Sequence, residues 1–120
     1  MVSQNKKGHW CEKWALLALM LKGYKPIALN VQTGRGTGAG EIDLIVCRGK
    51  TLIFVEVKKR KTYAKGLEAI TLDNQIRVVR ASAAYLKKHP EWQNYRVRYD
   101  AVICTPYRWP KHLPDAWRVL

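Results

Sequence analysis

The residues of this sequence best suited to chemistry are Asp43, Glu56 and Lys58, in the segments EIDLIV and VEVK. Hard cations such as Mg²⁺ take oxygen ligands, commonly one or two carboxylates together with phosphate and water. Lys58 follows Glu56 by two residues and shares its face of a strand, from which it can orient a water molecule or neutralise a phosphate. The pattern therefore predicts a metal-dependent hydrolytic site.

A β-hairpin is expected to bring these residues together. Residues 41–47 and 51–59 have the composition of strands, and the Gly-Lys pair at 49–50 places glycine first, as a type II′ turn prefers. A two-residue turn at this place pairs Arg48 with Thr51 and fixes the register of every later pair.

That register places Asp43 opposite Glu56 and Glu41 opposite Lys58. Directly opposite residues have Cβ atoms about 4.5–5.5 Å apart, and two like charges there destabilise a sheet. A divalent cation held by Asp43 and Glu56 would compensate their charges. The alternative is a half-exposed hairpin with solvated charges, in which Glu41 pairs with Lys58.

Glu12 is a third candidate ligand because of its place in an expected helix. Residues 4–22 carry apolar side chains at helical spacing, and Leu16, Leu19 and Met20 lie on the same stripe as Glu12. A carboxylate that points inward is costly unless it is paired or bound to metal. The alternative is a position at the edge of the stripe, from which Glu12 reaches solvent.

The other elements complete a mixed α/β pattern over residues 1–120, which we expect to form a single domain. The order is α-β-β-β-α-β, and a strand-helix-strand segment implies a right-handed crossover to a parallel neighbour. The expected fold is a mixed β-sheet flanked by helices. We expect a strand at 26–31, a loop from 60 to 71, a helix at 72–88 and a strand at 95–105, with no assignment for the tail.

The helix at 72–88 has clear start and stop signals. Thr71 is the expected N-cap, Asp73 stands in the first turn, and Pro90 follows the last turn. A hydrophobic stripe at helical spacing should face the sheet. The predicted stripe consists of Leu72, Ile76, Val79, Ala83 and Leu86.

Charge indicates the class of partner. Lysines and arginines number 22 against 9 acidic residues, a formal net charge of +13, which favours nucleic acid or an acidic membrane surface. Neither helix joins a wholly basic face to a bulky aromatic one, so we expect DNA and no membrane association. The candidate phosphate contacts are Arg35, Lys59, Arg60, Lys61, Arg77 and Arg80, and solvated surface charge is the alternative at each.

Two further features leave alternatives open. Residues 34–40 (GRGTGAG) lack the Lys-Ser/Thr ending of a Walker loop and precede a strand, so nucleotide binding is not expected. They form either a mobile loop that touches phosphates through Arg35 or a plain connector. Trp109 and Trp117 either stack bases, close a dimer interface, or pack the tail onto the core.

The cysteines and the first apolar run indicate the compartment. Cys11, Cys47 and Cys104 lie far apart without a CxxC pair, which is typical of a reducing environment. The apolar run at 14–21 is far shorter than the roughly 20 residues that cross a bilayer. No small-residue cleavage site follows it. We therefore expect a cytoplasmic protein.

The segment GEIDLI at 40–45, followed by VEVK at 55–58, resembles the YraN-like family of predicted endonucleases. That family is similar to archaeal Holliday junction resolvases and shares the restriction-endonuclease-like fold. The resemblance runs from Gly8 to about Val102. Arg60 belongs with the second of these segments, and the later blocks of the family are matched by Gln75, Arg77, Tyr85-Leu86 and Tyr99-Asp100.

The resemblance implies a Mg²⁺- or Mn²⁺-dependent endonuclease that acts on structured DNA, with a homodimer if it makes symmetric cuts. Two positions depart from the family pattern: Cys11 stands where a glycine usually precedes the first-helix acid, and Asn74 stands where a basic residue usually precedes the glutamine. The alternative function is a nucleic-acid-binding module with little or no turnover. The implied active-site residues are Glu12, Asp43, Glu56, Lys58 and Gln75.

Overall fold

The structure is a computed structural model that describes residues 2–33 and 40–119, with side chains from residue 10 onward. The predicted glycine-rich loop, apart from Gly40, and its phosphate contact Arg35 lie outside the described residues. The elements are α1 (Val2–Leu21), β1 (Lys25–Gln32), β2 (Glu41–Arg48), β3 (Thr51–Lys59), α2 (Tyr63–Ala69), α3 (Leu72–Lys88), the 3₁₀ turn η1 (Pro90–Trp92), β4 (Arg96–Cys104) and β5 (Lys111–Trp117).

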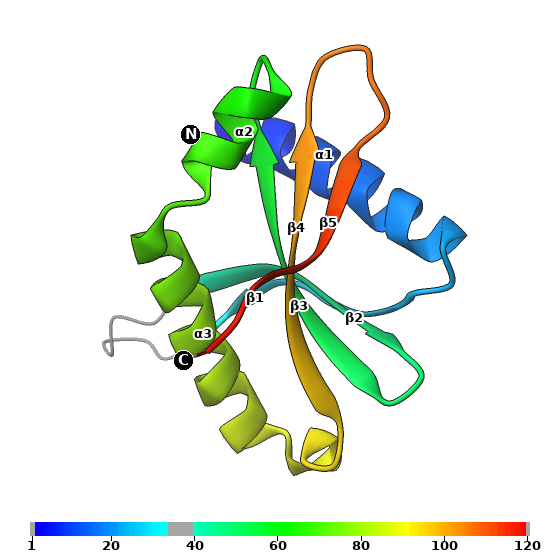
Figure 1. The fold of residues 1–120 in the computed structure, drawn as a ribbon, viewed down its shortest axis with the longest axis vertical. Coiled ribbons are helices and arrows are strands. Elements are labelled where there is room, and N and C mark those ends of the chain that lie inside the picture. Colours follow the sequence, from blue (N-terminus) through cyan, green and yellow to red (C-terminus); the bar gives the residue numbers. More distant parts are fainter. Residues whose placement is uncertain (1, 34–39, 120) are drawn as a thin grey trace.

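The strands form one five-stranded sheet in the order β1-β2-β3-β4-β5 (Figure 1). β3 and β4 are parallel, and the other neighbouring strands are antiparallel. The crossover from β3 to β4 passes through α2 and α3. The predicted mixed α/β fold and its parallel crossover are confirmed, and the arrangement is consistent with the restriction-endonuclease-like fold.

The hairpin of β2 and β3 has the predicted register near its turn. Its pairs run from Arg48–Thr51 to Leu44–Val55. Gly49 has a φ of 60°, which suits the first position of a type II′ turn and is strained for residues with a side chain. The turn therefore sets the register from its closed end outward.

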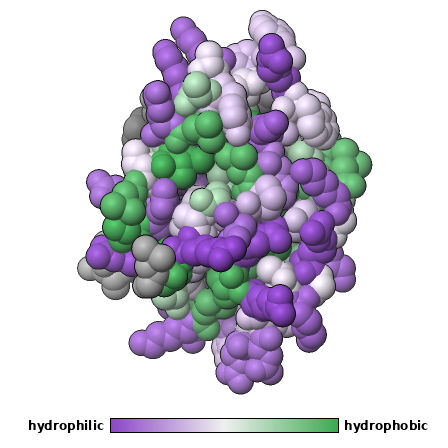
Figure 2. All heavy atoms as spheres, in the orientation of Figure 1, coloured by the Kyte–Doolittle hydropathy of each residue, from purple (hydrophilic) through white to green (hydrophobic). Residues whose placement is uncertain are grey.

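Helices cover both faces of the sheet, and the strands alternate between them (Figure 1). On β3, Ile53 and Val55 pack in the cluster beneath α1, while Leu52 and Phe54 pack in the cluster beneath α3. Hydrophilic side chains spread over the face seen in Figure 2, with hydrophobic patches between them. Within the described ranges, no helix is long and apolar enough to cross a membrane.

Besides the short turn η1, the predicted order lacks one helix and one strand of the structure. The expected loop before Thr71 contains α2, a short helix whose N-cap Thr62 accepts a hydrogen bond from Lys65 N at 3.2 Å. Gly66 lowers the helix propensity of this segment, so its pattern is weak. The unassigned tail contains β5, which includes Pro114 and pairs with β4 at the edge of the sheet, where proline is tolerated.

The predicted stripe of α3 is confirmed only in part, because Val79 and Leu86 pack against the core but its other members do not. The bounds of α3 and its Thr71 cap are confirmed. Leu72, Ile76 and Ala83 are exposed. The small side chains of Ala81 and Ser82 let the helix lie close to the sheet. The prediction failed here because it was based on the apolarity of the side chains and not on their size. The buried face of α3 consists of Val78, Ala81, Ser82 and Tyr85.

The predicted stripe of α1 is confirmed in part. Glu12 and Leu19 are buried and Leu16 is half-buried, but Met20 is exposed. The buried face is completed by Cys11, Ala15 and Ala18. As in α3, small residues face the sheet.

Candidate metal centre

Asp43 lies where β2 and β3 separate. The paired residues end at Leu44–Val55, and the next backbone amide of β3 that could continue the ladder, Val57 N, donates to Asp43 Oδ2 at 2.8 Å. A side chain thus replaces a backbone carbonyl. The Asp43 carboxylate is therefore fixed in the opening between the two strands.

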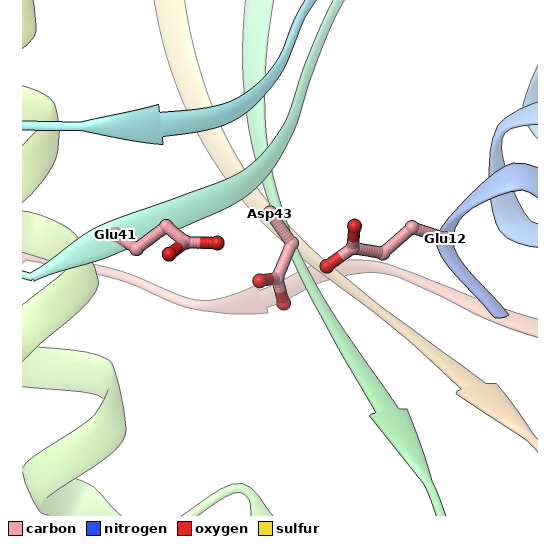
Figure 3. Close-up of side chains that lie close together, drawn as sticks. All are labelled: Glu12, Glu41 and Asp43. Carbon is pink, nitrogen blue, oxygen red and sulfur yellow. The ribbon is translucent and has the colours of Figure 1, made fainter. Parts of the chain in front are cut away.

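Three carboxylates from two elements meet at this opening. Glu12 on α1 and Glu41 on β2 point toward Asp43 from opposite sides (Figure 3). One carboxylate oxygen of each lies within 4.8 Å of the others. Glu41 Oε2 accepts from Gln32 Nε2 at 3.2 Å, while the buried Oε1 of Glu12 has no hydrogen-bond partner among the described residues. The cluster thus concentrates negative charge with little compensation.

A cleft of about 300 Å³ opens beside Asp43 toward α3. Lys58 Nζ lies 3.7 Å from Glu56 Oε2 and 3.5 Å from Asn74 Oδ1 inside it. We call this the acidic cleft, and its lining consists of Glu41, Asp43, Glu56, Val57, Lys58, Asn74, Arg77 and Val78.

Two carboxyl groups at the site have strongly raised pKa values. Burial, followed by the charge of Asp43, raises the pKa of Glu12 to about 7. Burial, followed by the hydrogen bond and charge of Asp43, raises the pKa of Glu56 to about 8, against the opposing effect of Lys58 and Arg77. Such perturbed groups gather at functional sites, where binding or chemistry offsets the cost of holding them together.

The residues present fit a hard divalent cation. The donors that meet at Asp43 are carboxylate oxygens, the ligand type that Mg²⁺ and Mn²⁺ prefer. The unpartnered Oε1 of Glu12 is a buried acceptor, and leaving such an atom unpaired costs free energy. A bound cation would satisfy this atom and offset the repulsion among the three carboxylates.

Asn30 supports the cluster from β1. It lies between the pairs Leu29–Leu44 and Val31–Ile42 and has a φ of 50°. Asparagine tolerates this left-handed conformation better than most residues with a side chain. Its side-chain hydrogen bond to Glu12 lowers the pKa of that carboxyl and opposes part of the effect of burial.

The structure brings together most, but not all, of the residues implied as the active site. The carboxylate of Asp43 interacts with those of both Glu12 and Glu56, and Lys58 lies beside Glu56. Gln75 is not among the described residues that line the acidic cleft, and its Nε2 lies 3.5 Å from the carbonyl oxygen of Ile70.

Glu41 and Asn74 are the site residues that sequence reasoning missed. Glu41 was expected opposite Lys58, but it joins Asp43 instead because the predicted register does not continue past Leu44. Asn74 Oδ1 accepts from both Lys58 and Arg77, while its Nδ2 donates to Ala69 O at 3.0 Å. The sequence signal for Asn74 was its position three residues after the N-cap, in the first turn of α3. In the structure its side chain contacts Lys58 of the hairpin.

The candidate phosphate contacts lie at two places. Arg77 lines the acidic cleft, and the exposed Arg80 is one turn further along α3. The exposed Lys59 is the last residue of β3, and the exposed Arg60 and Lys61 follow it. Both places are open to solvent.

Asp100 belongs to a separate, structural network. It is fully buried and accepts from Arg98 at 2.8 Å and from Asp115 N at 2.9 Å, while His112 Nε2 lies 2.7 Å from its Oδ2. Burial alone would raise the pKa of Asp100, but the hydrogen bonds from His112, Arg98 and Asp115 hold it below its usual value. The network ties β5 to β4.

Comparison with known proteins assigns the chain to a family. Residues 11–104 match the uncharacterised protein family UPF0102. UPF0102 proteins from Paramagnetospirillum magneticum, Methylorubrum extorquens and Rhizobium meliloti are 45%, 46% and 43% identical to the chain. These alignments cover 95%, 94% and 93% of this chain and 88%, 85% and 88% of the relatives.

The chain therefore belongs to the UPF0102 family, and the predicted resemblance to the YraN-like proteins is confirmed. The family name states no activity, so the function has to be argued from the site.

Proposed function

We propose that this protein is a cytoplasmic, metal-dependent endonuclease that hydrolyses phosphodiester bonds in structured DNA. The observation that carries the proposal is Asp43, which is fixed by Val57 N in the opening between β2 and β3 and is approached by the carboxylate of Glu12. Carboxylates that converge on one opening, beside a lysine and in a basic protein, suit the hydrolysis of a polyanion.

The proposed ligands of Mg²⁺ or Mn²⁺ are Asp43 and Glu12, with Glu41 and Glu56 completing the site directly or through water. A divalent cation supplies charge stabilisation to the phosphate and lowers the pKa of water. The raised pKa values of Glu12 and Glu56 mean that both carboxyls must release protons when a cation binds.

Lys58 is the proposed catalytic cation. It is an ammonium donor without a lone pair, so it does not serve as a metal ligand while charged. From its place between Glu56 and Asn74 it can position the attacking water or neutralise charge that develops on the phosphate. Asn74 is a positioning residue, because its Oδ1 fixes Lys58 and Arg77 relative to each other.

DNA is the proposed partner on the basis of charge. The formal net charge of +13 supplies attraction to phosphates without regard to sequence. Arg77 lines the acidic cleft beside Lys58, and Arg80 on α3 and the basic run at 59–61 are exposed cations on the elements that carry these two residues or directly follow them. The acidic residues of the site thus form a local cluster in an otherwise basic protein. This arrangement suits a divalent cation held against a phosphate.

A cleavage panel tests this function. Duplex, single-strand, flap and four-way junction DNA would be incubated with the protein and Mg²⁺, Mn²⁺ or EDTA. We expect nicks that depend on the cation, and paired cuts in the junction only if the protein dimerises on it, since symmetric cutting needs two sites. Binding to the panel without cleavage of any member would instead favour the nucleic-acid-binding module.

A further inference from the structure

A groove lined by aromatic side chains lies on the α1 side of the molecule, apart from the acidic cleft. Its volume is about 540 Å³, larger than the 300 Å³ of the acidic cleft. Trp10 and Trp14 of α1 line one side, and Tyr107 and Trp109 of the segment between β4 and β5 line the other. We call it the aromatic groove.

The indole rings in the aromatic groove are exposed. Trp10 and Trp109 are 61% and 53% exposed, and each meets Trp14 edge-on, at centroid distances of 5.5 and 5.8 Å. Trp117, in contrast, is 7% exposed and packs in the core beside Tyr99. An edge-on contact covers a face of only one of its two rings, and clustered exposed apolar surface marks a site of interaction.

The charge of the aromatic groove indicates its ligand. Lys59 and Arg108 line it together with the aromatic residues, and no acidic residue is among the described lining residues. On its other side, Trp109 borders a second hollow with Arg108 and Lys111, where Lys111 Nζ lies 5.6 Å from the Tyr63 ring centre. Aromatic faces alternating with cations are the pattern that binds single-stranded nucleic acid by stacking and phosphate contact.

The aromatic groove adjoins the acidic cleft along two elements. On α1, Cys11 lines the groove and the next residue, Glu12, belongs to the carboxylate cluster. On β3, Lys59 lines the groove and the preceding Lys58 lines the cleft. A strand lying in the groove would therefore reach the cleft around the end of β3.

We propose that the aromatic groove binds unpaired nucleotides of a DNA strand whose neighbouring segment enters the acidic cleft. This inference rests on the proposed nuclease function and narrows its substrate to DNA with a single-stranded segment beside a duplex. Trp109 supplies the main stacking surface, and Lys59 and Arg108 contact the phosphates.

The test compares a base-bearing strand with a strand that has no bases. Labelled oligothymidylate and an abasic strand of equal length would be titrated with the full chain in EDTA, by fluorescence anisotropy. We expect wild type to bind oligothymidylate about ten-fold more tightly, because stacking on one aromatic side chain is worth roughly this factor. Trp109→Ala should lose this preference while binding the abasic strand as wild type does.

Leu21→Ala is the matched control, because Leu21 is 71% exposed at the far end of α1. It should keep the full preference for bases. Equal affinity of wild type for both strands would overturn the inference, as would a preference that survives in both Trp109→Ala and Trp10→Ala. A wild-type dimer that Trp109→Ala converts to a monomer in sedimentation, without a preference for bases, would assign the groove to a second copy and also overturn it.

The two proposals fail separately. A preference for bases without cation-dependent cleavage of any substrate would refute the nuclease and leave the groove intact. Cation-dependent cleavage without a preference for bases would refute only the groove.

Discussion

At the residue scale, the site depends on how Asp43 is held. Its Oδ2 accepts from Val57 N–H, and its carboxylate also takes part in the cluster with Glu12 and Glu41. The hydrogen bond also explains why β2 leaves β3 at this point, since a side chain and not a backbone carbonyl satisfies the β3 amide. One residue thus opens the sheet and places a carboxylate in the opening.

The raised pKa of Glu56 predicts how stability depends on pH. The folded pKa of about 8 lies above the ordinary 4.5, so between these values the folded protein binds more protons than the unfolded chain. Glu56 should therefore lower the free energy of unfolding of the metal-free protein as pH rises from about 4.5 to about 8, by at most about 1.4 kcal/mol per pH unit. Glu12, with a pKa raised to about 7, should add to this fall in the lower part of the same range. Urea denaturation in EDTA across this range measures the effect.

Glu56→Gln removes the titrating group while keeping its shape. The variant should be more stable than wild type above pH 8 and no more stable near pH 4.5. Adding Mg²⁺ should stabilise wild type most at the alkaline end, where fewer protons must leave. A wild-type stability that rises with pH relative to Glu56→Gln would contradict the assignment of a buried carboxyl with a raised pKa.

Lys58→Ala separates catalysis from metal binding. Because Lys58 contacts Glu56 and Asn74 and is not a ligand, the variant should lose about 10²-fold or more of the cleavage rate and keep its affinity for Mn²⁺. Calorimetry with Mn²⁺ and single-turnover cleavage provide the two readouts. Lys50→Ala, at the opposite end of the same hairpin, is the control. Loss of Mn²⁺ affinity in a folded Lys58→Ala protein would show that the lysine organises the ligands.

At the element scale, the hairpin shows how far sequence reasoning reaches. The turn at 49–50 predicted the register correctly as far as Leu44–Val55. Beyond that pair, regular alternation would place Glu41 opposite Lys58, whereas the hydrogen bond from Val57 N to Asp43 ends the ladder. Local turn chemistry can be predicted from sequence, but a side chain that takes the place of the backbone depends on the assembled sheet.

The helices show a second limit. The bounds and cap of α3 follow from local signals such as Thr71, but its buried face was set by contacts with the sheet, including Tyr85 against Phe54 at 5.9 Å between ring centres. Asn74 contributes to the site because of that rotation, and Gln75 lies outside the described lining of the acidic cleft for the same reason. A helix with several comparable apolar lines does not specify its orientation by itself.

Gly66 tests the packing of α2 on the sheet. A Cβ built at Gly66 would lie 2.3 Å from Ile103 Cγ2 on β4, closer than real contacts allow. Alanine normally stabilises a helix relative to glycine by about 1 kcal/mol, but here overpacking should win, and Gly66→Ala should destabilise the protein by about 1–3 kcal/mol. Equilibrium denaturation measures the change, with Lys65→Ala as the exposed control on the same helix. A more stable Gly66→Ala protein would show that α2 does not pack as described.

At the scale of the whole molecule, acidic and basic side chains are distributed differently. The nine acidic residues are outnumbered by 22 basic ones, yet four of the acids gather at one opening of the sheet. In the proposed nuclease, the basic excess would attract DNA along the length of the nucleic acid, while the carboxylate cluster would act at a single phosphate. The affinity for DNA and the rate of cleavage should therefore respond to different substitutions.

Salt tests the first of these roles. Contacts between phosphates and basic side chains release counterions, so the logarithm of the affinity for duplex DNA should fall linearly with the logarithm of the salt concentration. Arg80→Ala should reduce this slope by about one unit and leave Mn²⁺ affinity unchanged. Anisotropy titrations at several salt concentrations give the slope. An affinity that does not change between low and physiological salt would remove the electrostatic basis for a DNA partner.

The most direct measurement of the central claim is nicking of supercoiled plasmid by wild type, Asp43→Asn and Asp73→Asn in Mn²⁺, with plasmid binding measured in parallel. The amide introduced by Asp43→Asn would retain an oxygen to accept from Val57 N–H but lose the charge that holds a cation, whereas Asp73 is an exposed acid outside the carboxylate cluster. We predict that wild type and Asp73→Asn nick the plasmid, and that Asp43→Asn binds it equally well without nicking it. Equal nicking by Asp43→Asn and wild type, or binding without Mn²⁺-dependent nicking by wild type, would contradict the account.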